Sequence, residues 1–414
     1  MAVSGPSGVS RAGARGEAGA VRPGVGSRPV WAEIDIGAVR HNASLLRRIA
    51  APAELCAVVK ADAYGHGAVP VARAALEGGA TWLAVATVDE GVALRSAGIA
   101  APILLLSEPS PESMSEVVSS GLTPTLYTSR GIRAAAGASA RAGEIADVHV
   151  KVDTGMHRVG AQRAELLEIV SAVDADPSLR FTALWTHFPV ADGVESQDRS
   201  FTEVQIRSLG AARDALVSAG YPPPWLHAAN SAGTLAYPPA RLDMVRCGIA
   251  LYGVSPFPVV DPAWSEVMAS TGARALRPVL SLRAKVTLVR ELDAAERPSY
   301  GRLYSLAGRS TVATVPLGYA DGVPRRYFTR GGTVLVGGRR RPLAGMVTMD
   351  QIVVDCGPGE EVAVGDEVVL IGTQGAESLT AYHWAAVLDT IAHEVFCGIG
   401  PRVPRVVVDR EGRS

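Results

Sequence analysis

The stretch AVVKADAYGHG, residues 57–67, places a lysine directly after a short apolar run. Lys60 therefore lies where a buried strand would end, and Tyr64 follows it by one helical turn. A lysine that is desolvated and close to other cations has a lowered pKa and can attack an aldehyde. The pattern therefore indicates covalent chemistry by an amine.

Other strand-like segments also end in cationic or hydrogen-bonding side chains. Each one alone is more simply explained as a capping or solvated side chain, but together they would line one cavity. The sequence has no His/Cys/Asp/Glu cluster at metal-ligand spacing, no GxSxG elbow and no GK[ST] phosphate loop. Pyridoxal phosphate is the cofactor that this combination favours, because it offers an aldehyde and an anion. The side chains are Lys151, Arg158, His187, Asn230, Ser231 and Arg246.

Short β-branched runs alternate with helix-like segments between about residues 31 and 255, which is typical of βα units around a parallel sheet. About eight strands over this length predict a (β/α)8 TIM-like barrel, with its active site at the carboxyl ends of the strands. An open doubly wound sheet is the alternative, but no GxGxxG turn follows the first strand. The predicted strands cover residues 55–60, 81–87, 102–107, 123–128, 148–153, 181–188, 225–230 and 244–253.

After about residue 270 the segments become β-rich and are separated by glycine, which predicts a second, mostly antiparallel domain. Within it only LTAYHWAAVLDTIAHEVF, residues 379–396, has the spacing of a helix. The sequence thus predicts a disordered arm over 1–28, a cofactor-binding barrel over 29–271 and a β-rich domain over 272–414.

The composition is that of a globular protein with a small-molecule partner. In its 414 residues, 40 Lys and Arg stand against 41 Asp and Glu, a balance that argues against binding to nucleic acid or to an anionic membrane. No apolar run approaches the roughly 18 residues of a membrane span. The four cysteines form no CxxC pair, so we expect reduced thiols in a cytoplasmic protein without a metal site.

A set of motifs resembles those of the alanine racemases, pyridoxal-phosphate enzymes built from a barrel and a β-domain. They run in the family's order from about residue 31 to residue 405. KADAYGHG and VRCGIALYGVSP are the most specific of them. The motifs are AVVKADAYGHG, KVDTGMHRVG, THF, ANSAGTL, VRCGIALYG, PSYGRLY, VPLGYADG, MVTMDQ and RVPR.

The resemblance implies that Lys60 binds the cofactor aldehyde, that His187 flanks the cofactor ring and that Arg246 faces the pyridine nitrogen. An arginine donates a hydrogen bond to this nitrogen without protonating it near neutral pH. The ring is then a weaker electron sink, which favours return of a proton to Cα over decarboxylation or transamination. The other cofactor-binding residues would be Tyr64, Asn230, Ser231, Gly248, Ile249 and Tyr319.

Racemisation also needs an acid/base group on the face opposite the lysine. Tyr300, in PSYGRLY, matches the family's second catalytic residue, and in the family its domain reaches into the barrel of a partner. The resemblance therefore implies a homodimer with a composite site that interconverts L- and D-alanine for peptidoglycan. Met349, from the same partner, would grip the substrate carboxylate together with Arg158. Lys151 matches a lysine that is carbamylated in many members.

Several positions depart from the family pattern. Pro401 stands where many relatives carry a tyrosine that touches the phosphate, and Met346 stands where an arginine is frequent near the access channel. Thr348 takes the place of a common cysteine, and Asp192 matches an acidic residue that often pairs with the missing arginine. These departures bear on substrate breadth more than on reaction type.

Three alternatives remain open at this point. A racemase of serine or another small amino acid would tolerate the changes in the access channel. A decarboxylase on the same architecture would profit from a carboxylate at the pyridine nitrogen, whereas the sequence offers Arg246 there. A non-catalytic protein that binds pyridoxal phosphate is usually a lone barrel, so the tyrosine motif after residue 290 argues against it.

Overall fold

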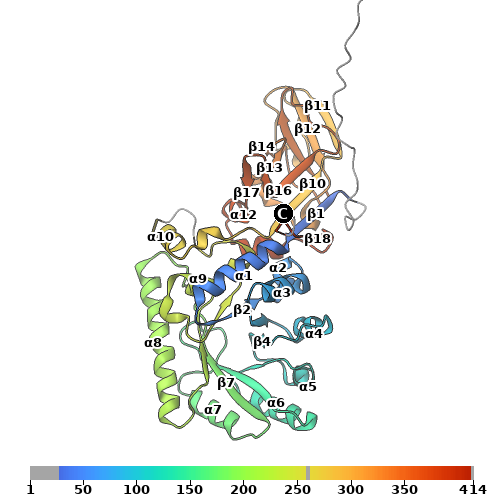
Figure 1. Cartoon of the computed structure of the whole chain (residues 1–414). Coiled ribbons are helices and arrows are strands. Elements are labelled where there is room, and N and C mark those ends of the chain that lie inside the picture. The colour runs from blue at the N-terminus through green and yellow to red at the C-terminus, as the bar shows by residue number, and fades with distance from the viewer. Residues whose placement is uncertain (1–27, 258–261, 412–414) are drawn as a thin grey trace, which may run out of the picture.

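Eight parallel strands form one sheet in the computed structural model, which describes residues 28–257 and 262–411. The order is β4-β3-β2-β9-β8-β7-β6-β5. Leu104 pairs in parallel with Thr123, whose amide donates to the Ile103 carbonyl at 2.9 Å, and this brings the two edges of the sheet together. The predicted barrel is therefore confirmed (Figure 1). Its strands are β2 (Glu54–Val58), β3 (Trp82–Val85), β4 (Ile103–Leu105), β5 (Thr125–Leu126), β6 (Ala146–Lys151), β7 (Leu179–Trp185), β8 (Trp225–His227) and β9 (Met244–Cys247).

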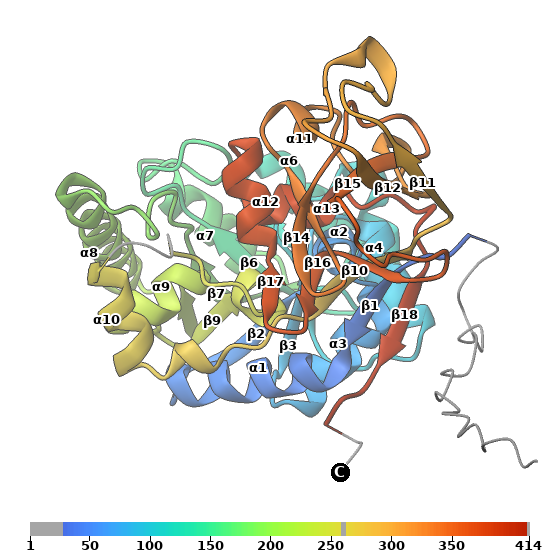
Figure 2. The same ribbon diagram turned by 90° about the horizontal axis from the view of Figure 1, so that it is seen from above.

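Helices surround this sheet, and several begin at side-chain caps that the sequence supplies. Thr87 and Glu90 form a reciprocal capping box at the start of α4. Thr128 caps α6, which ends at Gly143 in the left-handed conformation. Figure 2 shows the helices around the sheet from above. They are α1 (Ile36–Ala50), α3 (Ala68–Glu77), α4 (Val88–Ser96), α5 (Met114–Ser119), α6 (Ser129–Ala142), α7 (Leu166–Asp174), α8 (Ser196–Ser218), α9 (Ser231–Ala236) and α10 (Pro262–Ser270).

The second domain contains two mostly antiparallel sheets, as predicted. One has the order β14-β13-β16-β10-β1-β18, with β17 beside β16, and the other has the order β11-β12-β15. The helix predicted over residues 379–396 is instead two helices, because Asp389 takes a left-handed backbone (φ 54°) that ends the first one. The elements are β1 (Val30–Asp35), β10 (Leu280–Lys285), β11 (Leu288–Leu292), β12 (Ser310–Val315), α11 (Arg326–Thr329), β13 (Thr333–Val336), β14 (Arg339–Pro342), β15 (Ile352–Gly357), β16 (Glu367–Gln374), β17 (Glu377–Leu379), α12 (Ala381–Leu388), α13 (Ala392–Cys397) and β18 (Arg405–Val408).

The first strand of the chain, β1, belongs to the second domain's sheet. It pairs antiparallel with β10 and parallel with β18, although residues 30–35 fall within the range that the sequence assigned to the barrel. The described part of the chain therefore begins with a strand of the second domain's sheet, then forms the barrel, and then forms the rest of the second domain. The exact boundaries of the two domains stay a prediction.

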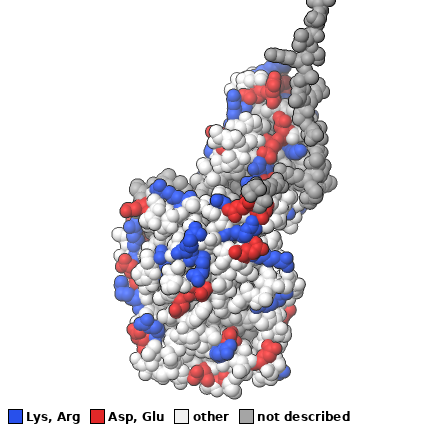
Figure 3. All heavy atoms as spheres, in the orientation of Figure 1, with Lys and Arg blue, Asp and Glu red and all other residues white. Residues whose placement is uncertain are grey.

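The arm predicted over residues 1–28 falls outside the described residues apart from Arg28, which pairs with the buried Asp321 at 2.6 Å. On the face shown in Figure 3, basic and acidic side chains of the described residues are interspersed. None of the helices in the described part of the chain is long and apolar enough to cross a membrane.

Candidate active site

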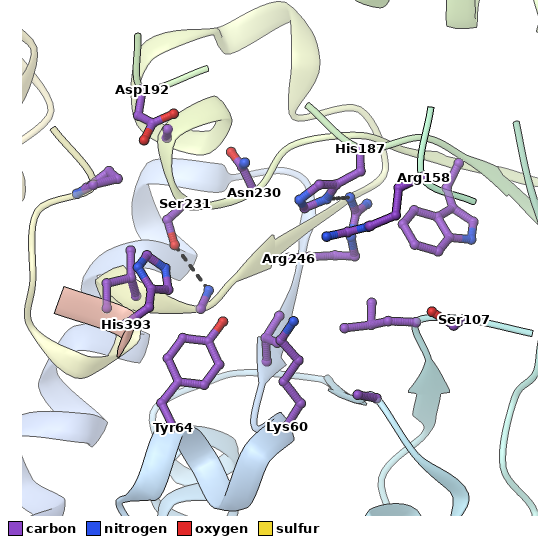
Figure 4. A pocket seen from close by; sticks show the side chains of 18 of the residues that line it. Lys60, Tyr64, Ser107, Arg158, His187, Asp192, Asn230, Ser231, Arg246 and His393 are labelled. Atoms are coloured by element: carbon purple, nitrogen blue, oxygen red, sulfur yellow. Dashed lines mark hydrogen bonds between the residues drawn. The ribbon is translucent and has the colours of Figure 1, made fainter. Parts of the chain in front are cut away.

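Lys60 and Tyr64 lie on an unusual turn that follows β2. The four residues Ala61 to Tyr64 all have left-handed dihedral angles, with φ between 50° and 55°. This conformation costs an L-residue about 1–2 kcal/mol, so the turn needs outside support. Glu90 accepts a hydrogen bond from the Ala61 amide at 2.6 Å, and Asp62 Oδ1 accepts one from the Ala68 amide at 2.7 Å. The expected helical turn is therefore left-handed, and it aims both side chains into one cavity (Figure 4).

This cavity lies at the carboxyl ends of the barrel strands and has a volume of about 480 Å³. It brings together all of the barrel residues that the sequence predicted for the site. Asp192 lines it as well, whereas Met346 does not and is buried elsewhere. The predicted residues in the cavity are Lys60, Tyr64, Lys151, Arg158, His187, Asn230, Ser231, Arg246, Gly248 and Ile249.

One end of the cavity is a small cradle of hydrogen-bonding groups. Ser231 Oγ accepts hydrogen bonds from the amides of Gly248 and Ala250, at 3.1 and 3.3 Å. Asn230 caps α9 by accepting from the Gly233 amide at 2.9 Å, which fixes the position of Ser231. A Cβ on Gly248 would lie 2.3 Å from the Tyr64 hydroxyl, so only glycine leaves this cradle open. The hydroxyls of Ser231 and Tyr64 donate to no acceptor among the described residues, and neutral donors of this kind suit a phosphate group.

Arg246, on β9, is held at the floor of the same cavity. Its Nη1 donates to His227 Nδ1 at 2.7 Å, and its Nη2 donates to the carbonyls of Thr186 and Ala228, at 2.8 and 2.9 Å. Nη2 also donates to His187 Nδ1 at 3.2 Å. Burial lowers the pKa of Arg246 to about 10, so the guanidinium stays charged at neutral pH. Among the hydrogen bonds of the described residues, none uses Nε, which leaves a donor for a ligand.

The hydrogen bonds of Arg246 continue into a pair of buried histidines that the sequence analysis missed. His227 Nε2 lies 3.1 Å from His149 Nδ1. Because Arg246 donates to His227 Nδ1, His227 must carry its proton on Nε2 and donate it to His149. Burial lowers the pKa of His149 to about 3, so the pair is neutral. The signal was one histidine inside each of two predicted strands, VHVKVD and WLHAAN.

The cavity is rich in positive charge. Lys60, Lys151, Arg158 and Arg246 line it, and Asp192 is the single acidic side chain among the described lining residues. Burial and then the charge of Arg158 lower the pKa of Lys60. Burial and then the charge of Arg246 lower the pKa of Lys151 to about 7, so that much of its amine is neutral. The cavity therefore favours anionic groups and contains two amines that can act as bases.

The predicted residues from the second domain form a separate hollow, lined among others by Tyr300, Tyr319 and Met349. Tyr300 is 70% exposed and Met349 52% exposed, and neither lines the barrel cavity of the same chain. Ser299 and Arg302 take left-handed backbone conformations on either side of Tyr300, and Ser299 Oγ donates to the Met346 carbonyl at 2.6 Å. Tyr300, which the sequence predicted as the second catalytic residue, thus lies on a fixed but open surface.

The loop of Tyr319 is joined to the loop of Met349 by backbone hydrogen bonds. The Tyr319 amide donates to the Thr348 carbonyl at 3.0 Å, and the Ala320 amide donates to the Met349 carbonyl at 3.1 Å. A Cβ on Gly318 would lie 2.2 Å from the Thr348 carbonyl oxygen, so glycine permits this close approach. Tyr319 and Met349 are therefore presented together.

Two family models match the chain over most of its length. The model of the alanine racemase N-terminal domain matches residues 34–256, and the model of the C-terminal domain matches residues 279–407. The chain belongs to the alanine racemase family. The alanine racemase of Symbiobacterium thermophilum is 46% identical over 380 residues, which cover 92% of this chain and 97% of the relative.

Solved structures agree with this family assignment. Alanine racemase from Bacillus anthracis with bound L-Ala-P superposes with a TM-score of 0.84 at 36% identity, covering 92% of this chain and 96% of that one. A histidine racemase from Leuconostoc mesenteroides superposes with a TM-score of 0.81 at 30% identity, covering 92% and 99%. The family architecture thus extends to a racemase named for a larger side chain.

Proposed function

We propose that this chain interconverts L- and D-alanine with pyridoxal phosphate as cofactor and supplies D-alanine for peptidoglycan. The observation that carries the proposal is the single cavity in which Lys60 and Arg246 converge beside the cradle of Ser231 and Gly248. A cationic cavity with a lysine of lowered pKa and an unused arginine donor fits an aldehyde with a phosphate and a ring nitrogen. Its assignment to the alanine racemase family supports the same reaction. A cytoplasmic location remains a prediction of the sequence.

The residues present fit the cofactor. Tyr64, Ser231 and the amides of Gly248 and Ile249 would hold the phosphate, with Asn230 keeping Ser231 in place. Arg246 Nε would donate to the ring nitrogen. When bound, pyridoxal phosphate acts as an electron sink that acidifies the Cα–H bond of an amino acid.

Lys60 would move the proton on one face of the substrate Cα. Burial and the charge of Arg158 lower its pKa, which favours the unprotonated form that a base requires. Arg246 is locked by its hydrogen bonds and charged at neutral pH, so it would orient the ring without giving up a proton. This arrangement favours return of the proton to Cα and argues against a decarboxylase.

Tyr300 of a partner subunit would move the proton on the opposite face. Tyr300 is 70% exposed in its own chain and therefore open to water there, which supports a site that a second copy completes. Leu303, Tyr319 and Met349 are exposed large apolar side chains in the same domain, and they support a homodimer contact there. His187 carries its proton on Nε2, because Nδ1 accepts from Arg246, and it would donate from there toward the tyrosine oxygen.

Lys151 is proposed to carry a carbamate that orients Arg158 toward the substrate carboxylate. A pKa of about 7 leaves a neutral amine that can add carbon dioxide, and the product anion would offset three neighbouring cations. Carbamate formation should therefore increase as the pH rises through 7. Intact mass measured in bicarbonate buffer at pH 8, with Lys151→Ala as the control, should show the added carbon dioxide only in the wild-type protein.

A chiral assay of the purified protein on a panel of amino acids tests the proposed reaction. We expect alanine to have the highest kcat/KM, with serine and histidine as competitors because Asp192 lines the cavity without the family's arginine. A higher kcat/KM for serine or histidine would move the assignment to another racemase. Release of carbon dioxide without racemisation would overturn it.

A further inference from the structure

Asp321 is a fully buried carboxylate in the loop of Tyr319. Its side chain is 0% exposed. Asp321 Oδ2 accepts a hydrogen bond from the Gly318 amide at 3.0 Å, and this bond closes the turn around Tyr319. A buried carboxylate is stable only where positive charge and hydrogen bonds compensate it. The groups that compensate Asp321 therefore also determine the shape of the loop of Tyr319.

Arg28 supplies this compensation from the other end of the chain. Its guanidinium contacts both carboxylate oxygens of Asp321, with Nη2 at 2.6 Å from Oδ1 and Nη1 at 3.1 Å from Oδ2. Such a bidentate pair is stronger than a neutral hydrogen bond and fixes the orientation of both groups. Arg28 Nη1 also donates to the Pro316 carbonyl at 3.2 Å. The residue two positions before β1 thus holds the segment that follows β12.

Arg402 extends the ion pair to the loop of Met349. Its Nε lies 3.3 Å from Asp321 Oδ1, and its Nη2 donates to Asp350 Oδ1 at 2.7 Å. Asp350 directly follows Met349 in the chain. Two arginines and two aspartates therefore form one network of balanced charge, and it joins the loops that present Tyr319 and Met349.

This network supports the exposed face from behind. Tyr319 and Met349 line the open hollow of the second domain and are 44% and 52% exposed. Arg28 and Asp321 are not among the described residues that line it. Side chains that are half exposed have little packing of their own to hold them, so their positions depend on the backbone that the network fixes.

We infer that Arg28 is a positioning residue for the active site of the partner subunit, because through Asp321 it holds the loops of Tyr319 and Met349 in the shape that the other chain's cavity receives. The inference rests on the composite site of the proposed function. Its consequence is specific: loss of Arg28 should weaken the reaction at the Lys60 of the other chain and leave the reaction at the Lys60 of its own chain almost unchanged.

Mixed dimers with one working site test this consequence. Lys60→Ala and Tyr300→Phe chains with different affinity tags are reassembled, and the mixed dimer is isolated. Its working site combines the barrel of the Tyr300→Phe chain with the second domain of the Lys60→Ala chain. Arg28→Gln on the Lys60→Ala chain should lower kcat/KM by about tenfold to a hundredfold, because the loops are misplaced. Arg28→Gln on the Tyr300→Phe chain should change it by less than about twofold, because that second domain faces the inactive site.

Two further variants guard this experiment. Arg28→Lys keeps the charge but not the planar fork, so it should recover part of the lost kcat/KM when placed on the Lys60→Ala chain. Arg340→Ala breaks another ion pair of the second domain, the one with Glu377 at 2.7 Å, and should leave the mixed dimer fully active from either chain.

Hydrogen exchange gives a measurement that does not depend on the reaction. In full-length Arg28→Gln protein, peptides that cover residues 316–323 and 348–351 should exchange faster than in the wild type. The amides of Gly318, Tyr319 and Ala320 report the loss directly, because each donates a hydrogen bond within these loops. In Arg340→Ala the same peptides should exchange as in the wild type.

The outcomes distinguish this inference from the proposed function. If the wild type does not racemise alanine, or if the mixed dimer is inactive without the change at Arg28, the proposed function fails, and hydrogen exchange still decides whether Arg28 holds the two loops. If Arg28→Gln lowers kcat/KM equally from either chain, the arginine only stabilises the fold and the inference is overturned. Unchanged exchange in both loops overturns it as well.

Discussion

The cavity at the barrel mouth and the exposed face of the second domain differ in how far their side chains are exposed to water. In the cavity, Arg246 and Lys151 are 2% and 3% exposed, and a network of hydrogen bonds fixes Arg246. On the second domain, Tyr300 and Met349 are more than half exposed. Under the proposed function, the cavity would hold the cofactor within one chain, whereas the exposed face would need another surface to exclude water around Tyr300. Cofactor binding and racemisation should therefore separate experimentally.

Both regions use a strained backbone to present a side chain. Left-handed residues precede Tyr64 in the cavity and flank Tyr300 on the exposed face. In each case a hydrogen bond from a neighbouring segment stabilises the strained backbone. Glu90 accepts it in the cavity, and the Met346 carbonyl accepts it on the exposed face. Strain of this kind gathers at functional sites, because it places a group where regular structure cannot.

The largest expected effect is the loss of both cofactor binding and racemisation when the lysine of the cavity is replaced. Lys60→Ala should abolish the absorbance of the bound cofactor and lower racemisation by a factor of about a thousand or more, because the covalent anchor and one base are removed. The chain has three lysines. Lys285→Ala, on β10 and outside the cavity, is the matched control and should keep both functions. Persistence of the cofactor band in Lys60→Ala would place the anchor elsewhere.

Tyr300→Phe should separate the two regions. Racemisation should fall by roughly 10²–10⁴, the usual contribution of a general acid/base, while cofactor absorbance stays. In deuterated water the variant should still exchange the Cα hydrogen of one enantiomer, because Lys60 is intact. Tyr304→Phe removes a hydroxyl of the same domain that donates to Asp355 at 2.8 Å, and it should racemise normally. Equal loss in both variants would remove Tyr300 from the mechanism.

Mixing the two inactive variants tests whether the exposed face completes a partner's cavity. When Lys60→Ala and Tyr300→Phe chains are dissociated and reassembled together, half of the dimers should be mixed, and each of these has one intact site. About a quarter of the wild-type activity should return. A mixture that stays inactive, although native mass spectrometry shows mixed dimers, would mean that both residues act within one chain.

The smallest expected effect concerns the buried histidines beneath the cavity. The pKa of His149 is lowered to about 3 in the folded protein, and an unfolded histidine titrates near 6.5. The stability due to this group is present above pH 6.5 and is lost as the pH falls toward 3. Urea unfolding between pH 6 and 4 gives the free energy of unfolding at each pH. In His149→Gln this free energy should fall with decreasing pH less steeply than in the wild type, by about 1.4 kcal/mol per pH unit. If the free energy of unfolding falls equally steeply with decreasing pH in the wild type and in His149→Gln, the titration of His149 does not contribute to the stability.

Much of the fold could be predicted from local pattern. All eight barrel strands were found, because β-branched runs bounded by helical segments report burial on both faces of a parallel sheet. Two features of the fold were not predicted from the sequence. Residues 30–35 joined the sheet of the second domain, which depends on partners some 250 and 375 residues away. The helix predicted over 379–396 is broken at Asp389, whose left-handed backbone ends α12 although the helical spacing of the sequence continues.

The sequence by itself determined the chemical groups of this protein: the lysine after its strand, the arginine opposite it, the glycine cradle and the distant tyrosine. It could do so because residue type and position along a strand are local properties. Only the tertiary structure decided which of these groups meet. It placed the barrel residues in one cavity, left Tyr300 outside it, and brought His227 beneath it and Arg28 against Asp321, because such contacts depend on how segments far apart in the chain pack together.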